Sequence, residues 1–311
     1  MTGSEFIAEQ FEANRSHLRG VAYRMLGSLS EADDAVQEAW LRLSRSDTSG
    51  VQNLAGWLTT VVARVCLDIL RSRKARSEQS LEEEKTEPAA DSRARTLGWS
   101  TGVRDPEEEA ILAESVGLAL LVVLDTLAPA ERLAFVLHDM FAVPFEEIAP
   151  ILGRSKDATR QLASRARRRV RGADKVRDAG VSVQRKVVDA FLAAMRARDF
   201  EGLIALLDPD VVVRMESHAG VREVRGAENW AKNALAYQAR LRDAQFARSM
   251  QLALVDGAVG IIFAPLGKLS RVLRFIIADG KIRDMEIIVN PKRLRALEIA
   301  TLTERESHPL Q

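Results

Sequence analysis

The stretch EEIAPILGRSKDATRQLASRARRRVRG concentrates hydrogen-bond donors and positive charge in a short part of the chain. An apolar helical pattern ends at Gly153, and Ser155 after it is a residue type that caps a new helix. In that new helix the residues expected to pack inward recur every four positions: Ala158, Leu162 and Ala166. The side chains left to point outward are mainly donors: Lys156, Thr159, Arg160, Gln161, Ser164 and Arg165.

A helix, a tight turn and a second helix are typical of DNA-binding proteins. Arg160 and Gln161, near the start of the second helix, could reach base edges, whereas Arg168 and its arginine neighbours suit phosphates. The stretch therefore predicts a DNA-binding helix-turn-helix. The alternative is an ordinary helical hairpin with a solvated basic face, because this pattern is only moderately specific.

The sequence SLSEADDAVQEAWLRL predicts a helix with an exposed acidic side. Ser30 and Asp33 have the spacing of a capping box at its start. Ala35, Ala39 and Leu43 fall on one face and are expected to pack inward. The other side carries polar and apolar groups together: Asp34, Gln37, Glu38 and Leu41. We expect this mixed surface to bind a protein rather than DNA.

A third helix, AGWLTTVVARVCLDILRSRKAR, combines an aromatic residue with positive charges. Its predicted packing positions are Leu58, Val62, Val65 and Ile69. Another side brings together Trp57, Arg64, Asp68 and Arg71, and the helix ends in Arg73, Lys74 and Arg76. An aromatic ring beside cations can hold unstacked bases. The alternative is a core tryptophan at a helix start, followed by a solvated basic end.

Composition limits the classes to which the chain can belong. The chain has 311 residues and is 47% hydrophobic, which predicts two or three globular domains. Its net charge is only +1, so any nucleic-acid binding must come from local basic patches. The single Cys66 excludes an internal disulfide and a multi-cysteine zinc site, and we expect neither a metal nor a cofactor. Because the sequence has no signal peptide and no membrane-spanning run, we expect a soluble cytoplasmic protein.

The pattern of the sequence changes along the chain and predicts its domain organisation. The predicted parts are a helical module at 1–76, a flexible linker at 77–106, a helical module with the helix-turn-helix at 107–174, a third domain at 180–300, and a tail at 301–311. The linker is predicted because residues 77–106 lose periodicity and contain an acidic run and Pro88.

The third domain begins with an amphipathic helix and continues with strands. The predicted strands are Asp210–Glu216, Met250–Val255, Ala258–Ala264, Arg271–Ala278 and Lys281–Val289. Asp279 and Gly280 form a favourable hairpin turn. Because helices come first, we expect antiparallel strands in a curved sheet around a helix. The predicted fold class is multidomain, with two all-α modules followed by an α+β domain.

Three segments together resemble a known family. EADDAVQEAWLRL, GWLTTVVARVCLDILRSRKAR and LAPAERLAFVLHDMFAVPFEEIAPILGRSKDATRQLASRARRRVR are similar, in order and spacing, to regions 2 and 4 of extracytoplasmic-function sigma factors. The resemblance implies a protein that binds the β′ and β subunits of core RNA polymerase and directs initiation at specific promoters. It also implies that the linker threads the polymerase between the two regions.

The resemblance implies roles for three sets of residues. Those expected to dock on the β′ clamp helices are Asp33, Asp34, Gln37, Glu38, Trp40 and Leu41. Those expected at the melted minus-10 element are Trp57, Arg64, Asp68, Arg71, Arg73 and Lys74. Those expected at the minus-35 element are Ser155, Lys156, Thr159, Arg160, Gln161, Ser164, Arg165 and Arg168.

The third domain resembles a SnoaL-like cone, which sigma factors of the SigJ type carry in this position. The supporting segments are VVDAFLAAMRARDFEGLIALLDPDVVV, VRGAENWAKNAL and IADGKIRDMEIIVNPKRL. The last contains the Asn-Pro-x-x-Leu motif of these proteins, which implies a regulatory role for Asn290, Pro291 and Leu294. MESHAG replaces the Asp-Gly-Gly-Gly loop often found in such domains, so no role is expected for that loop.

We expect the third domain to regulate the sigma modules, with a small ligand as a candidate partner in its pocket, rather than to be an enzyme. Acid and base groups for proton abstraction are available in principle: Asp210, Glu216, His218 and Glu286. A cyclase tethered to a DNA-binding unit would need a committed acid/base pair, which the residues do not reveal. A one-component regulator with a ligand-sensing domain stays open, but it would not need the acidic helix at 33–41.

Overall fold

The computed structural model describes residues 3–46, 51, 53–83, 117–171, 179–217, 220–240 and 249–302. The chain divides into two compact units, one of residues 1–109 and 127–166, and the other of residues 110–126 and 167–311. Most of the predicted linker and nearly all of the predicted tail lie outside the described residues. Each unit is described separately below.

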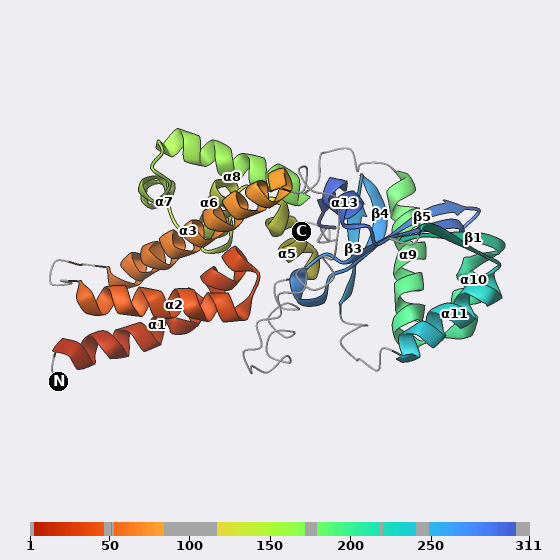
Figure 1. Cartoon of the computed structure of the whole chain (residues 1–311), viewed down its shortest axis with the longest axis horizontal. Helices are drawn as coiled ribbons and strands as arrows, with labels where there is room; N and C mark the ends of the chain where they lie inside the picture. The colour runs from red at the N-terminus through yellow and green to blue at the C-terminus, as the bar shows by residue number, and fades with distance from the viewer. Residues whose placement is uncertain are drawn as a thin grey trace, which may run out of the picture. The chain divides into compact units, whose positions relative to one another are not determined.

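The first unit is helical (Figure 1). Its elements are α1 (Gly3–Leu26), α2 (Leu29–Arg45), α3 (Leu54–Glu83), α6 (Pro129–Phe135), the π-helix η1 (Val136–Met140), α7 (Phe145–Leu152) and the first part of α8 (Lys156–Arg171). Helices α1, α2 and α3 contact one another. Helix α3 runs to Glu83, so the prediction that the linker begins at residue 77 is wrong at that end.

Helical periodicity explains how α2 and α3 pack. Ala35, Ala39 and Leu43 of α2 are at most 1% exposed, which confirms the predicted inner face. In α3 the predicted positions Leu58, Val62 and Val65 are buried, whereas Ile69 is half-buried. The predicted capping box is wrong, since Ser28 is the N-cap residue of α2 and Ser30 already lies inside the helix. Asp33 is therefore too far into the helix for the predicted role.

Arg132 of α6 ties this helix to the end of α1. Its side chain is 3% exposed, and Nη1 donates a hydrogen bond of 2.7 Å to the carbonyl oxygen of Met25. Met25 lies in the last turn of α1, where carbonyl groups have no partner within the helix. Next to this bond, the Arg24 guanidinium lies 5.2 Å from the ring centre of Phe141, which follows η1. The two predicted helical modules therefore contact each other within the first unit.

We expect Arg132→Ala to destabilise the first unit by about 2 kcal/mol, because a buried carbonyl loses its donor and a cavity is left. Hydrogen exchange by mass spectrometry on the full chain should then show amides of α1 and α6 exchanging about 30-fold faster. Arg42→Ala is the control, because the ion pair of Arg42 with Glu38, the side-chain contact seen within the described residues, is exposed and should matter little. Equal exchange in the two variants would contradict a stabilising role for Arg132.

The second unit is α+β, as predicted (Figure 1). Its helices are α5 (Leu118–Thr126), the end of α8, α9 (Ala179–Ala197), α10 (Phe200–Leu206), α11 (Ala227–Arg240), the 3-10 helix η2 (Pro265–Gly267) and α13 (Pro291–Ala296). Its strands are β1 (Leu207–Ser217), β2 (Gly220–Arg225), β3 (Met250–Val255), β4 (Ala258–Phe263), β5 (Arg271–Ala278), β6 (Lys281–Ile288) and β7 (Ile299–Ala300).

The strands form one sheet in the order β2-β1-β6-β5-β4-β3-β7. All five predicted strands are present, and Asp279 and Gly280 make the predicted turn with positive φ angles of 54° and 74°. The expectation of a purely antiparallel sheet is wrong, because β1 pairs with β6 in parallel. This pairing brings the first strand of the domain beside the last long one. The sequence pattern did not indicate β2 or β7.

One face of the sheet packs against the helices. Val213, Met285 and Phe275 lie side by side on β1, β6 and β5 and are at most 9% exposed. The ring of Phe191 on α9 lies 5.3 Å from that of Phe275 and 5.5 Å from that of Trp230 on α11, measured between ring centres. These three rings belong to the hydrophobic core between the sheet and the helices.

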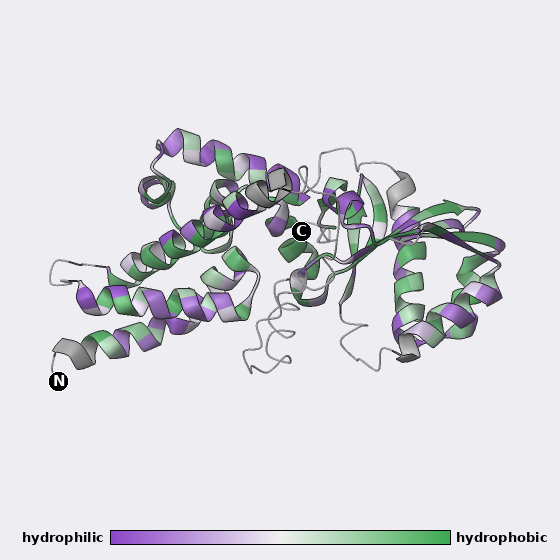
Figure 2. Ribbon diagram, in the orientation of Figure 1, coloured by the Kyte–Doolittle hydropathy of each residue, from purple (hydrophilic) through white to green (hydrophobic). Residues whose placement is uncertain are grey.

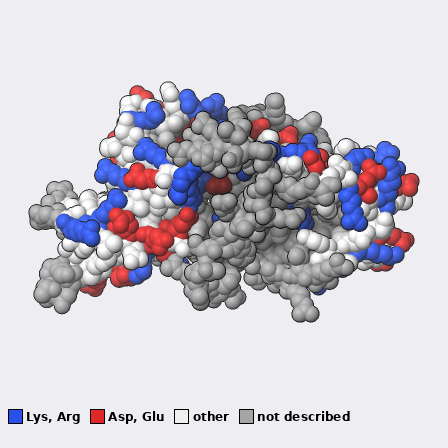
Figure 3. All heavy atoms as spheres, in the orientation of Figure 1, with Lys and Arg blue, Asp and Glu red and all other residues white. Residues whose placement is uncertain are grey.

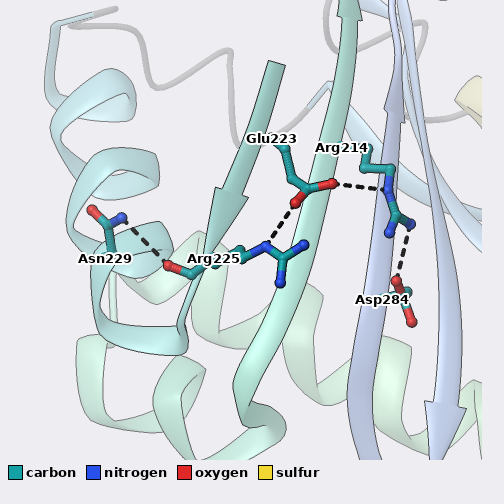
Figure 4. Close-up of polar contacts among 5 residues, drawn as sticks. All are labelled: Arg214, Glu223, Arg225, Asn229 and Asp284. Atoms are coloured by element: carbon teal, nitrogen blue, oxygen red, sulfur yellow. Dashed lines mark hydrogen bonds and ion pairs between the residues drawn. The ribbon is translucent and has the colours of Figure 1, made fainter. Parts of the chain in front are cut away.

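The opposite face of the sheet is charged. Arg214 on β1 contacts Glu223 on β2 at 3.2 Å and Asp284 on β6 at 3.0 Å (Figure 4). Arg225 contacts the other oxygen of Glu223 at 2.7 Å, which holds the pKa of that carboxyl below its ordinary value. A hollow of about 340 Å³ lies on this face, between Arg214 and Arg274.

The described part of the chain contains no helix that is long and apolar enough to cross a membrane. Among the described residues, no group of three or more histidine, cysteine or acidic side chains is placed to hold a metal ion. Burial raises the pKa of the Cys66 thiol to about 12. Cys66 is therefore a core residue of α3 in a fully protonated state.

Candidate protein and nucleic-acid interfaces

The turn between α7 and α8 has the geometry that its sequence predicts. Gly153 ends α7 in the left-handed conformation at φ 63°, which costs a glycine little and other residues more. The Ser155 hydroxyl oxygen then accepts a hydrogen bond of 3.2 Å from the Ala158 amide, which makes Ser155 the cap of α8. The predicted helix-turn-helix is therefore present in this part of the chain.

The buried face of α8 differs from the predicted one. Thr159, Ala163 and Ala166 are fully buried, whereas Ala158 and Leu162 are only half-buried. The prediction that Thr159 points outward to DNA is therefore wrong. Its hydroxyl donates a 2.9 Å hydrogen bond to the Ser155 carbonyl, so the side chain needs no other partner when buried.

The outer face of α8 keeps the other predicted DNA-binding side chains. All of these residues are exposed: Ser155, Lys156, Arg160, Gln161, Ser164, Arg165 and Arg168. Lys156 also forms an ion pair with Glu146 of α7, and this hydrogen bond holds the pKa of the Glu146 carboxyl below its ordinary value. Figure 3 shows basic side chains gathered over α8.

Arg160 has two neighbours that sequence reasoning did not assign to the site. Its guanidinium lies 5.7 Å from the ring centre of Phe145 and 3.3 Å from a carboxylate oxygen of Asp157. The Phe145 ring also stacks on His138, with 3.8 Å between ring centres. These contacts restrict the Arg160 side chain before any ligand binds. The spacing of Asp157 and Arg160, three residues apart on a helix, was the available signal.

Some of the predicted polymerase-binding residues of α2 are exposed, and the others contact side chains of their own unit. Asp34 and Gln37 are exposed, and Leu41 is 39% exposed. Asp33 is bound by Arg19 of α1 at 2.9 Å. The remaining two predicted residues also have partners, since Glu38 pairs with Arg42 at 2.9 Å and the Trp40 ring lies 5.0 Å from that of Phe11. Figure 3 shows acidic side chains gathered over α2.

The predicted minus-10 surface on α3 is similarly divided. Arg64, Asp68, Arg71 and Lys74 are exposed, and Trp57 is half-buried. Asp68 and Arg71 lie 4.0 Å apart. Arg73 instead turns toward its own unit, where it pairs with Glu31 of α2 and donates a hydrogen bond of 3.2 Å to the Leu26 carbonyl. The exposed residues share one side of α3, as their spacing predicts.

The Asn-Pro-x-x-Leu motif forms the start of α13. Asn290 caps this helix by accepting a 2.9 Å hydrogen bond from the Lys292 amide, and Pro291 takes its first position. Leu294 is 8% exposed and packs inward. Arg293 forms ion pairs with Glu216 and, at 2.8 Å, with Glu286, and these hydrogen bonds raise the pKa of Arg293 above its ordinary value.

Comparison with known proteins covers nearly the whole chain. Residues 10–76 match the family described as Sigma-70 region 2, and residues 117–170 match Sigma-70, region 4. The chain is 38% identical over 312 aligned residues to ECF RNA polymerase sigma factor SigJ of Mycobacterium tuberculosis, with 96% of each protein covered. The chain belongs to the ECF RNA polymerase sigma factors.

Two further comparisons are with a second relative and with a solved structure. The chain is 31% identical to the probable ECF RNA polymerase sigma factor SigI of Mycobacterium tuberculosis, over 96% of this chain and 98% of that protein. A crystal structure of the Mycobacterium tuberculosis SigJ is 34% identical, covers 92% of this chain and 98% of its own, and aligns with a TM-score of 0.42.

As a sigma factor, the protein acts with RNA polymerase in promoter-specific transcription initiation, which confirms the function that the sequence predicted. The one-component regulator is not favoured, because that class does not explain the match of residues 10–76 to region 2. Helix α2, with its acidic side, and the part of α3 that carries Trp57 and the basic residues both lie within that matched segment of this sigma factor.

Proposed function

We propose that this ECF sigma factor makes three different contacts through three exposed surfaces, which lie on α2, α3 and α8. Asp34, Gln37 and Leu41 of α2 contact the β′ clamp helices of core polymerase. Asp33, Glu38 and Trp40 support that surface through their partners on α1 and α2. We expect the protein to act in the cytoplasm, where its polymerase is. The β subunit contact expected of region 4 belongs to the same proposal.

For promoter DNA, we propose that α3 binds the melted minus-10 element and α8 the minus-35 element. Trp57, Arg64 and Arg71 offer one ring and two cations on one side of α3, which suits unstacked bases and their phosphates. Arg160 and Gln161 of α8 would read base edges, and Arg168 would bind a phosphate. The observation that carries this proposal is the capped helix-turn-helix with its donors exposed on one face.

We propose that the C-terminal domain regulates the sigma modules and does not act as an enzyme. Glu216 and Glu286, two of the candidate acid/base groups, both form ion pairs with Arg293, which favours a structural role for them. His218 lies outside the described residues. The hollow on the charged face is lined by both basic and acidic side chains, so a ligand bound there would be polar.

Transcription by core polymerase with three forms of the protein tests this regulation. The forms are the full chain, a chain with Asn290 and Leu294 changed to alanine, and a chain that ends at Val181. We expect three different activities at matched concentration, since the motif variant keeps contacts that the truncated chain loses. Equal activities of all three would show that the C-terminal domain is a passive addition.

A further inference from the structure

Helix α5 belongs to region 4 by sequence but packs on the C-terminal domain. Residues 117–170 match region 4, yet α5 lies in the second unit and contacts β3, β7 and η2. Hydrophobic residues run along its length (Figure 2), and six of them are buried: Leu118, Ala119, Leu121, Val122, Val123 and Leu124. Helix α5 is therefore the part of region 4 whose apolar residues pack on the C-terminal domain.

Two close contacts fix α5 in this position. The Ala119 amide lies in the first turn of α5, where amides have no partner within the helix. It donates a 2.9 Å hydrogen bond to the side-chain oxygen of Gln251 on β3. Gly267 of η2 lies so near Leu121 that a β-carbon added there would come within 3.1 Å of its side chain. The C-terminal domain therefore supplies both a cap and a close-packed surface to α5.

The last turn of α8 is bound in the same unit. The Val170 carbonyl oxygen accepts two hydrogen bonds from Thr301, one of 2.9 Å from its amide and one of 2.7 Å from its hydroxyl. Val170 is 8% exposed, and its carbonyl is among the last four of α8, which have no partner within the helix. Thr301 therefore acts as a cap for α8 although it follows Val170 by 131 residues.

The chain around Thr301 is held in place by the sheet. Strand β7 pairs with β3, where Ile299 lies opposite Val255 and Ala300 opposite Leu254. Just before β7, Glu298 and Asp256 exchange two hydrogen bonds, of 2.8 Å and 2.9 Å. The Asn290-capped helix α13 immediately precedes this segment and directs the chain toward β7. The position of Thr301 thus depends on the sheet of the C-terminal domain.

We propose that Thr301 is a positioning residue for promoter binding, which fixes the last turn of α8 so that its arginines meet DNA phosphates. Arg168 and Arg171 are exposed on either side of Val170. If this turn frayed, both side chains would lose their fixed geometry, and binding a phosphate would then cost more conformational entropy. This inference rests on the proposed role of α8 at the minus-35 element. It also gives the C-terminal domain a direct means of changing promoter affinity.

Thr301→Val in the full chain removes the hydroxyl donor but keeps the amide and nearly the same volume. We expect the holoenzyme to bind a minus-35 promoter about 5-fold more weakly, from the loss of one hydrogen bond. The loss should be equal for all base substitutions at the minus-35 element, and the plot of log affinity against log salt should become shallower. Thr301→Ser keeps both donors and should behave like the unchanged protein.

A weaker affinity with an unchanged salt slope would assign Thr301 to general stability and overturn the proposal, as would a Thr301→Val variant that binds like the unchanged protein. Arg168→Ala separates this result from a failure of the proposed function. If Arg168→Ala leaves the salt slope unchanged, the end of α8 does not bind phosphate and the underlying role of α8 is wrong. If it flattens the slope while Thr301→Val does not, only the role of Thr301 is wrong.

Discussion

Replacing Asp34 with lysine and Gln37 with alanine together is expected to lower the affinity for core polymerase about 100-fold. Both side chains are exposed on α2 beside Leu41 and would be central to a protein interface. A few central residues usually carry most of the binding energy, and a reversed charge adds repulsion to the lost contact. Affinity for core polymerase, measured by titration with fluorescently labelled protein, gives the result directly.

The matched control for this change is Glu12→Lys. Glu12 is an exposed acidic residue of α1 that pairs only with Arg15 on the same helix at 2.9 Å, among the contacts of the described residues. This substitution makes the same change of charge in the same unit, and it should leave core affinity within about 3-fold of the unchanged protein. Unchanged core affinity in the α2 variant would contradict its assignment as the polymerase-binding surface.

Arg160→Ala is expected to cost about 1 to 3 kcal/mol of discrimination at one base pair of the minus-35 element. Phe145 and Asp157 already restrict the Arg160 side chain, so little entropy is lost when it binds a base edge. The measurement is holoenzyme affinity for a set of promoters that differ at single minus-35 positions. One position should lose its preference while the others keep theirs.

Arg168→Ala serves as the control for Arg160, since it lies on the same helix and removes the same charge. It should weaken all promoters alike and reduce the slope of log affinity against log salt by about 1, as expected for one lost phosphate contact. If Arg160→Ala also lowered the affinity for every sequence equally, Arg160 would be a phosphate contact and not a reader of bases.

The parts of the site that could be predicted from sequence depend on short-range rules. Gly153 and Ser155 predicted the turn before α8 because a left-handed glycine and a capping hydroxyl act within a few residues. The inner face of α2 followed from helical spacing in the same way. Thr159 was assigned to the wrong face because its hydroxyl reads as a donor to DNA, whereas it bonds back to its own helix.

The parts that could not be predicted depend on partners far away in the sequence. Nothing near Asp33 or Arg73 indicates that Arg19 and Glu31 bind them, and so remove them from the exposed surfaces. The parallel pairing of β1 with β6 is likewise invisible in either strand. The packing of α5 on the C-terminal domain likewise appears only in the three-dimensional structure.

The proposed roles of α2, α3 and α8 are tested most directly by footprinting combined with run-off transcription. The template is a promoter with separate minus-10 and minus-35 elements. With core polymerase and the unchanged chain, we predict protection of both elements and a transcript from a single start site. The α2 variant should lose the protection and the transcript together. Arg160→Ala should lose base preference at the minus-35 element alone. Protection of an operator-like site by the chain without core polymerase, with no transcript when polymerase is added, would contradict the proposed roles of these surfaces.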